Sequence, residues 1–215
     1  MQVRPLTPEG LVDRLAGLLA AQRPGEHLRV ALDGAPPTEP ERLADALVGP
    51  LRAQGRPALR VSARAFLRPA SLRFEHGRED PDAYYEDWLD VAALDREVLS
   101  PLAPGGRGRY LPTLWDPVTD RATRAEYATA PPGAVLLLDG SLLLGRWLDL
   151  DVTVHLAVRP ATLARRLPPD ERWTLPAYER YRQEAEPEES ADVVVRVDDP
   201  RHPALVERSG EELPG

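Results

Sequence analysis

The sequence predicts an α/β fold in three layers, with a mainly parallel five-stranded sheet flanked by helices. Two observations lead to this prediction. Five short apolar runs punctuate the chain, and the stretches between them carry apolar residues at helical spacing. Strand and helix therefore alternate, which is typical of a parallel sheet covered by helices on both faces. In such folds, ligands bind at the carboxyl ends of the strands.

The individual elements can be placed in chain order. The apolar runs predict strands at Leu28–Leu32, Ala58–Ser62, Ala134–Asp139, Val152–Val158 and Asp192–Val197. Helical spacing predicts helices at Pro8–Ala21, Pro40–Gln54, Asp82–Leu99, Ala161–Leu167 and Pro176–Glu184. The first helix has a clear start, because Thr7 can cap it, Pro8 fits the first helical position and Glu9 places an acid in the first turn.

The length predicts one domain over residues 1–215. We expect its core at about residues 28–199, with an N-terminal helix at about 8–22. The remaining residues, about 200–215, form a C-terminal tail that we expect to fray after Asp199.

Composition excludes several classes of function. The net charge is -8 and the pI is near 5.1, so a general nucleic-acid binder is not expected. There is no apolar run of 18 residues and no signal-peptide pattern, so we expect a cytoplasmic protein that does not bind membranes. The chain has no cysteine, and its four histidines are widely scattered, so no metal site is expected.

All 27 basic residues are arginine, and the chain contains no lysine. The strand at Leu28–Leu32 leads through Asp33 and Gly34 towards a helix near Pro40, which is the context that a phosphate-binding loop requires. The motif G-x-x-x-x-G-K-[ST], started at Gly34, places its second glycine at Glu39, its lysine at Pro40 and its Ser/Thr at Glu41.

These changes disfavour the binding of a nucleoside triphosphate. Pro36, Pro37 and Pro40 have no backbone N–H to donate to a phosphate. Glu39 and Glu41 bring negative charge to the helix start, where one carboxylate about 4 Å from a phosphate charge repels it by roughly 4 kcal/mol at an effective dielectric near 20. Phosphate binding therefore competes with an alternative that we favour. In it, Thr38 and Glu41 form an S/T-x-x-E capping box and satisfy the N–H groups of the helix themselves.

Several segments, taken in order, resemble the uridine kinase-like nucleoside kinases of the P-loop superfamily, particularly the bacterial branch, over roughly residues 29–200. They are Val30–Gly34, Arg60–Pro69, Gly77–Tyr85, Arg109–Tyr110, Trp115–Asp120, Val135–Leu143, Thr162–Arg166 and Glu188–Val194. The resemblance implies a P-loop NTPase-like fold with a degenerate Walker A motif.

The resemblance also implies roles for single residues. The family's catalytic base, an aspartate two residues before a phenylalanine, falls on Arg64, and a guanidinium cannot accept the hydroxyl proton of a nucleoside at neutral pH. Glu79 falls at the carboxylate that holds the ribose, and Tyr110, Trp115 and Asp116 fall in the segment that packs on the base. These four form the candidate substrate pocket, although Asp120 stands where many relatives have histidine.

Other residues have two interpretations. Asp139 is similar to the family's acid near magnesium, but an acid at a strand end more often caps the following turn, so no metal is expected there. Arg165 and Arg166 resemble lid arginines, but we favour a surface-helix role for both. Tyr84, Tyr85 and Trp88 have near-helical spacing, which favours core packing over a stacking platform.

Three hypotheses follow. The leading one is a non-catalytic ligand-binding or scaffold homologue that needs no cofactor and binds a nucleoside-like small molecule or a protein partner. The alternative is an active ATP- and Mg-dependent nucleoside or small-molecule kinase, in which arginine replaces the lysine, with Arg68 or Arg165 as the phosphate clamp. The third is a site reshaped for a different anionic substrate.

Overall fold

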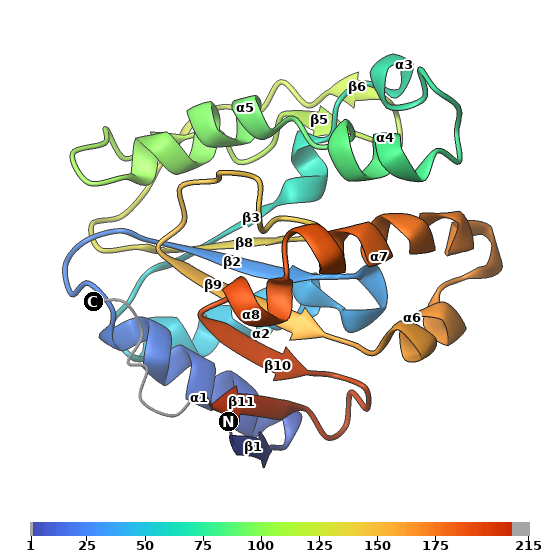
Figure 1. The fold of residues 1–215 in the computed structure, drawn as a ribbon. Coiled ribbons are helices and arrows are strands. Elements are labelled where there is room, and N and C mark those ends of the chain that lie inside the picture. Colours follow the sequence, from blue (N-terminus) through green and yellow to red (C-terminus); the bar gives the residue numbers. More distant parts are fainter. Residues whose placement is uncertain (1, 208–215) are drawn as a thin grey trace.

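A seven-stranded sheet forms the centre of the computed structural model, which describes residues 2–207. The strand order is β1-β11-β10-β9-β2-β8-β3. Five of these strands run parallel, namely β2 (Leu28–Gly34), β3 (Ala58–Ser62), β8 (Val135–Gly140), β9 (Val152–Ala157) and β10 (Val193–Arg196). They are the five strands predicted from the sequence. The α/β class with a mainly parallel sheet between helices is thus confirmed (Figure 1).

Two further strands extend the sheet beyond the prediction. β1 (Gln2–Pro5) and β11 (Ala204–Glu207) pair with each other and β11 pairs with β10, in both cases antiparallel. The expectation that the tail frays after Asp199 is therefore wrong for residues 204–207. Leu205 is 4% exposed, and burial of its side chain helps to hold β11 against the sheet. The rest of the predicted tail, residues 208–215, lies outside the described residues.

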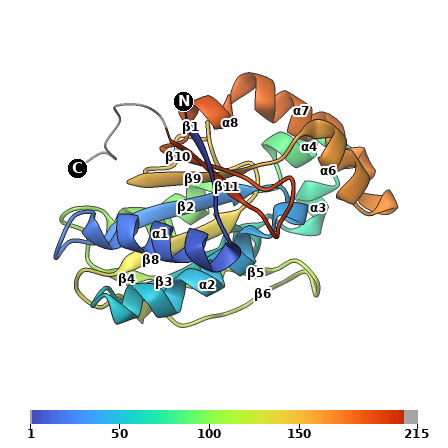
Figure 2. The same ribbon diagram turned by 90° about the horizontal axis from the view of Figure 1, so that it is seen from below.

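Helices cover both faces of the sheet. α1 (Pro8–Ala21) and α2 (Pro40–Ala53) lie on one face, as Figure 2 shows, and their leucines share a core with β2, β8 and β9. Thr7 caps α1 as predicted, with its Oγ1 accepting from the Gly10 N–H at 3.0 Å. The other face carries α5 (Val91–Leu94) and the turns η3 (Asp95–Leu99) and η4 (Ser100–Leu102), which pack against β3 and β8.

Most of the remaining elements lie around the carboxyl ends of the strands, whereas β4 (Arg109–Tyr110) and β7 (Ala128–Thr129) pair beside the start of β8. The others are α3 (Ala70–Arg73), α4 (Pro81–Glu86), α6 (Pro160–Arg166), α7 (Leu175–Glu184), α8 (Pro187–Ser190), the turns η1 (Pro36–Thr38), η2 (Ala63–Phe66) and η5 (Pro169–Thr174), and the short strands β5 (Trp115–Asp116) and β6 (Arg121–Ala122). No helix within residues 2–207 is long and apolar enough to span a membrane.

The helix predicted at Asp82–Leu99 is interrupted. After α4, Leu89 forms an isolated bridge with Leu67, and the Asp90 N–H donates to the Phe66 carbonyl at 2.9 Å. The Asp90 side chain then accepts from the Ala93 N–H at 2.9 Å and starts α5. An N-cap inside the helical pattern thus divides the predicted helix, because a cap residue has non-helical backbone angles.

Candidate ligand-binding cleft

The turn between β2 and α2 differs from the predicted capping box. Thr38 does not cap α2; its Oγ1 donates back to the Ala35 carbonyl at 2.7 Å and thereby closes η1. The N-cap of α2 is Glu39, which has φ 55° and ψ 53° and makes no side-chain capping bond. The capping-box prediction is therefore wrong, because the proline pair produces a 3-10 turn that includes Thr38, and α2 begins one residue later, with Glu39 as its N-cap.

This turn uses its own hydrogen-bond donors. The Thr38 and Glu39 N–H groups donate to the Ala35 and Pro36 carbonyls at 2.8 and 3.0 Å. The three prolines of the loop have no N–H. The Thr38 hydroxyl lies so close to Gly34 that a Cβ at that glycine would overlap it. The segment is thus a closed turn, whereas a phosphate loop is a cradle of free N–H groups.

A cleft of about 570 Å³ opens at the carboxyl ends of the central strands. This is the edge where the parallel order predicted a ligand. Glu41 lies on its α2 side, Ser62 ends β3 and Arg64 follows it in η2. Asp139 is the last residue but one of β8, and Trp173 belongs to η5. Its volume falls within the range of small-molecule sites.

Asp139 is held by the neighbouring strand. Its Oδ1 accepts from Arg60 Nε at 3.1 Å and its Oδ2 accepts from Ser62 Oγ at 2.8 Å. Burial raises the pKa of this carboxyl above its ordinary value, while Ser62 and Arg60 offset part of that rise. Arg60 also pairs with Asp45. The hydrogen bonds of Asp139 thus go across to β3, and the expectation that it caps the following turn is not met.

Positive charge exceeds negative charge in the cleft. Its lining includes the arginines Arg60, Arg64, Arg73 and Arg146 and the acids Glu41, Asp139 and Glu171. Within residues 2–207, Arg146 donates to main-chain carbonyls alone, among them that of Glu86 at 3.5 Å, and burial lowers the pKa of its guanidinium. Neither Arg64 nor Arg146 forms an ion pair with any residue in 2–207. An anion would therefore meet two guanidiniums that lack carboxylate partners.

Aromatic rings form one wall of the cleft. Tyr84 stands edge to face against Trp88 at 4.9 Å and against Trp173 at 5.5 Å between ring centroids. The Tyr84 hydroxyl shares a 2.9 Å hydrogen bond with that of Tyr178. The buried Trp88 Nε1 has no hydrogen-bond partner among the described residues. Tyr84 and Trp88 thus combine the two roles that the sequence left open, because they pack together and also line the cleft.

The four residues of the candidate substrate pocket do not line this cleft. Glu79 is exposed. Tyr110 is 7% exposed and belongs to the core beside β8, where burial raises the pKa of its hydroxyl. Trp115 donates to Asp120 at 3.0 Å, and Asp116 accepts from the Thr119 hydroxyl at 2.6 Å. The segment is thus a self-bonded hairpin that contributes Pro117 to the lining of the cleft but none of the four predicted residues.

The arginines proposed for anion contact also lie outside it. Arg68 approaches Asp87 at 3.5 Å, and both side chains are partly exposed. Arg165 is exposed on α6. Arg166 donates to the carbonyls of Val197 and Asp198 at 2.9 and 2.5 Å and so holds α6 against the end of β10. These side chains lie apart from the cleft arginines.

Sequence reasoning missed Arg60, Arg73 and Arg146. Arg60 had a readable signal, because it lies two residues before Ser62 and side chains two apart on a strand share a face. Arg146 lies in the loop after β8, and nothing local shows that this loop folds back over the strand ends. Among residues 2–207, no three histidine or acidic side chains gather closely enough to hold a metal ion.

The fold and the cleft can be compared with known proteins. No family model and no curated protein matches the sequence. Among solved structures, a possible uridine kinase from Bacillus stearothermophilus has a TM-score of 0.69 at 21% identity, covering 85% of this chain and 96% of that one. A protein assigned as a fructose transport system kinase from Silicibacter has a TM-score of 0.57 at 26% identity, covering 86% and 95%. A D-glycerate 3-kinase from Cryptococcus neoformans has a TM-score of 0.53 at 15% identity, covering 82% and 80%.

These neighbours support the resemblance seen in the sequence. The chain has the fold of P-loop kinases, including uridine kinase-like ones. At these identities the comparison speaks for the fold, and one fold hosts many activities. Activity must therefore be argued from the residues of the cleft.

Proposed function

We propose that the protein binds a small anionic ligand in this cleft and does not transfer a phosphoryl group. The observation that carries the proposal is the closed turn at residues 35–39. The Thr38 and Glu39 N–H groups are bonded within the turn, Pro36 and Pro37 have none, and Glu41 follows at the start of α2. These residues do not fit a nucleoside triphosphate, because the cradle that would bind its phosphates is neither open nor positive.

The position of the missing base supports the same proposal. Arg64 lies in η2 at the mouth of the cleft, where the kinase resemblance expects a carboxylate. A guanidinium stays protonated at neutral pH and cannot accept a proton from a hydroxyl nucleophile. It can bind an anion with two parallel hydrogen bonds. The substitution thus replaces a proton acceptor with an anion-binding group.

The walls of the cleft suggest the shape of the ligand. Rings at Tyr84, Trp88 and Trp173 offer an apolar surface, while Arg64 and Arg146 offer two unpaired charges. A flat molecule that carries an anionic group complements both. A nucleoside monophosphate has this form, so the proposed ligand is nucleoside-like but already phosphorylated or otherwise anionic.

Calorimetric titration at moderate salt tests the proposal. We expect uridine 5′-monophosphate to bind with a dissociation constant of about 100 μM or tighter, roughly -5.5 kcal/mol. Uridine should bind at least about tenfold more weakly, because it lacks the charge-assisted hydrogen bonds. ATP with magnesium should give no saturable heat up to millimolar concentration.

Arg64→Gln provides the test variant, with Arg165→Gln as its matched control. Both arginines are exposed, but only Arg64 lines the cleft. Arg64→Gln should weaken the monophosphate about tenfold, and Arg165→Gln should leave its affinity unchanged. Equal effects of the two variants would refute a specific anion site. Saturable ATP binding together with phosphoryl transfer to a nucleoside would refute the proposal as a whole.

An active kinase is the second candidate, and Asp139 favours it. This acid stands at the end of β8 with Ser62 at 2.8 Å, beside the cleft arginines. In that case, Asp139→Asn should abolish ATP consumption measured with a nucleoside panel. If no small molecule binds, a protein partner becomes the better explanation, and Trp147, whose side chain is 99% exposed, is where contact would be sought.

A further inference from the structure

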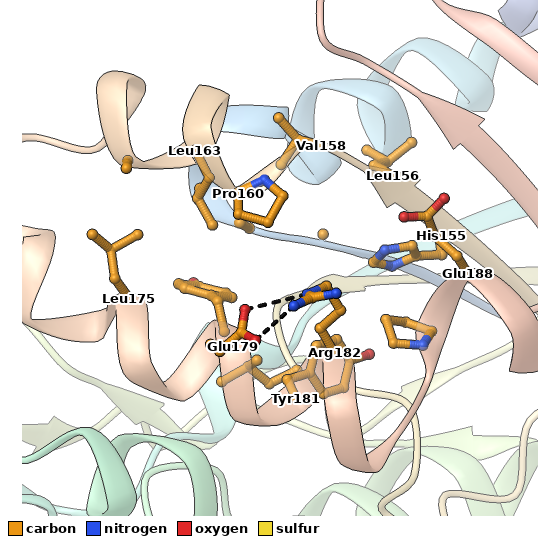
Figure 3. A pocket seen from close by; sticks show the side chains of 16 residues that line it. His155, Leu156, Val158, Pro160, Leu163, Leu175, Glu179, Tyr181, Arg182 and Glu188 are labelled. Carbon is orange, nitrogen blue, oxygen red and sulfur yellow. Dashed lines mark hydrogen bonds and ion pairs between the residues drawn. The ribbon is translucent and has the colours of Figure 1, made fainter.

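A second cavity lies beside the cleft and is of different character. It has a volume of about 280 Å³, is partly open to solvent and is lined mainly by the end of β9 together with α6, α7 and α8. Leu156, Val158, Leu163 and Leu175 supply much of its lining (Figure 3). It meets the cleft at Leu142 and Tyr178, which line both spaces. The proposal below rests on this cavity alone and does not depend on the anion site.

One polar side chain in this cavity is held in a fixed orientation. His155 lies on β9 directly opposite Asp33 on β2, and its Nδ1 is 2.7 Å from Asp33 Oδ2. Asp33 is fully buried, and its Oδ1 also accepts from the Leu143 N–H at 2.9 Å. A carboxylate that accepts from its neighbours favours the histidine tautomer with the proton on Nδ1. In the neutral ring, Nε2 then carries the free lone pair.

The hydroxyl of the neighbouring Tyr181 already makes hydrogen bonds within the protein. The Tyr181 hydroxyl donates to Asp33 Oδ2 at 2.8 Å and accepts from the Leu144 N–H at 3.1 Å. Its hydrogen-bonding capacity is therefore directed into the protein and not into the cavity. An apolar occupant would therefore meet the edge of the His155 ring that carries Nε2. The His155 side chain is 11% exposed.

The rim of the cavity sets the charge of the occupant. Glu179 and Arg182 pair across 2.6 Å on α7, as Figure 3 shows. Glu188, which also lines the cavity, lies 3.6 Å from Arg196 Nη2. Each of these three charges thus has a partner of opposite sign, so the rim favours a neutral occupant over an ion, in contrast to the larger cleft.

We propose that this cavity is a binding site for a small, neutral, mainly apolar molecule whose single hydroxyl donates to His155 Nε2. The size fits one or two rings, because the volume is about twice that of the roughly 150 Å³ cavity that takes up benzene. The apolar lining supplies the affinity, and the histidine, oriented by Asp33, selects a hydroxyl over an ether or hydrocarbon.

Paired probes test the proposal, namely 2-naphthol and its methyl ether 2-methoxynaphthalene. They share the ring system, and only the naphthol has a donor. Titration followed by NMR should give a dissociation constant on the order of 1 mM or tighter for the naphthol. The ether should bind at least about tenfold more weakly. Absence of naphthol binding up to its solubility limit would overturn the proposal.

Variants locate the site. Ala164→Phe fills the cavity and should abolish binding, whereas Ala161→Phe, exposed on the same helix and outside the lining, should not. His155→Asn keeps an N–H donor near the Nδ1 position but removes Nε2, so naphthol and ether should then bind alike. Unchanged naphthol binding in folded Ala164→Phe would overturn the proposal.

A measurement on the unmodified protein covers the case in which a variant fails to fold. Nuclear Overhauser contacts between the naphthol and the His155 ring or the Leu163 methyl groups are expected if the cavity is occupied. Contacts only with residues outside the cavity would refute the site.

Discussion

A buried ion pair stabilises the amino ends of the central strands β2 and β9, opposite the cleft at their carboxyl ends. Arg29, the second residue of β2, is 3% exposed, and its Nε and Nη2 each donate to Asp151 at 2.9 Å. The Arg29 N–H also donates to Asp151, at 2.8 Å. Arg23 contacts the same carboxylate at 2.6 Å, and Asp149 accepts from Arg29 Nη1 at 2.6 Å. The carboxylate of Asp151 thus joins the starts of β2 and β9.

The perturbation is Asp151→Asn, which keeps the shape of the side chain and removes its charge. Breaking one side of a buried pair costs about 3–5 kcal/mol, because the partner charge stays buried and uncompensated. Asp149 is 66% exposed and still reaches Arg29, so we expect the low end, about 3 kcal/mol. Arg29→Met combined with Asp151→Asn should lose less than the sum of the single variants, with a coupling of about 1–3 kcal/mol.

Urea unfolding at neutral and acid pH measures these differences. Burial raises the pKa of Asp151, but hydrogen bonds from Arg29 and the charges of Arg29 and Arg23 lower it by more, so the net shift is downward. Because the folded-state pKa lies below the unfolded one, the carboxylate stabilises the fold fully above about pH 4, and this stabilisation is lost as the pH falls further.

The difference between wild type and Asp151→Asn should therefore be large at pH 7 and shrink towards pH 3. A loss below about 1 kcal/mol at pH 7 would refute the reasoning, as would a difference that is independent of pH. The monophosphate affinity at pH 7 should not change, because the pair lies away from the cleft.

Three other substitutions have defined outcomes in the same unfolding assay. Tyr181→Phe removes a hydroxyl that bridges a buried carboxylate and a main-chain N–H, so we expect a loss of about 2–4 kcal/mol, and a neutral result would contradict the bridge. Gly140→Ala should lose about 1–3 kcal/mol because its Cβ would collide with a core side chain, whereas Gly49→Ala, with open space on α2, should gain about 0.5–1 kcal/mol. If the two glycine variants behave alike, steric overlap is not the cause. Glu39→Gly should stabilise by about 1 kcal/mol by relieving a left-handed backbone, without creating ATP binding; calorimetry checks the second part.

The sequence was sufficient for the central sheet because each parallel strand is buried on both faces. β2 and β8 consist almost wholly of buried residues, and such runs are visible without any knowledge of pairing. β1 and β11 were not predicted. β1 is a short edge strand, and β11 lies between it and β10, so the pairing of both strands is a long-range property.

Prediction of the site was less complete for a similar reason. The effect of Glu39, Pro40 and Glu41 on phosphate binding could be predicted from the sequence, because each of these residues acts within the loop itself. The direction of the Thr38 hydrogen bond could not be predicted from the sequence, since a capping box and a 3-10 turn compete for the same hydroxyl. The arginines of the cleft come from β3, η2, α3 and the loop after β8, and only the folded chain brings them together.

The distribution of charge in the cleft connects the altered loop with the missing base. The α2 side of the cleft, where a phosphate loop would hold an anion, carries Glu41 and proline. The β3 and β8 side carries Arg60, Arg64 and Arg146, and Arg60 is partly neutralised by Asp139. An anion in this cleft is therefore attracted to the side where a kinase would place its nucleophile. A phosphate held there, beside Arg64, would belong to a ligand that is already phosphorylated. The α2 side, where a kinase binds its phosphate donor, does not favour a second phosphate, so no phosphoryl group would be available for transfer.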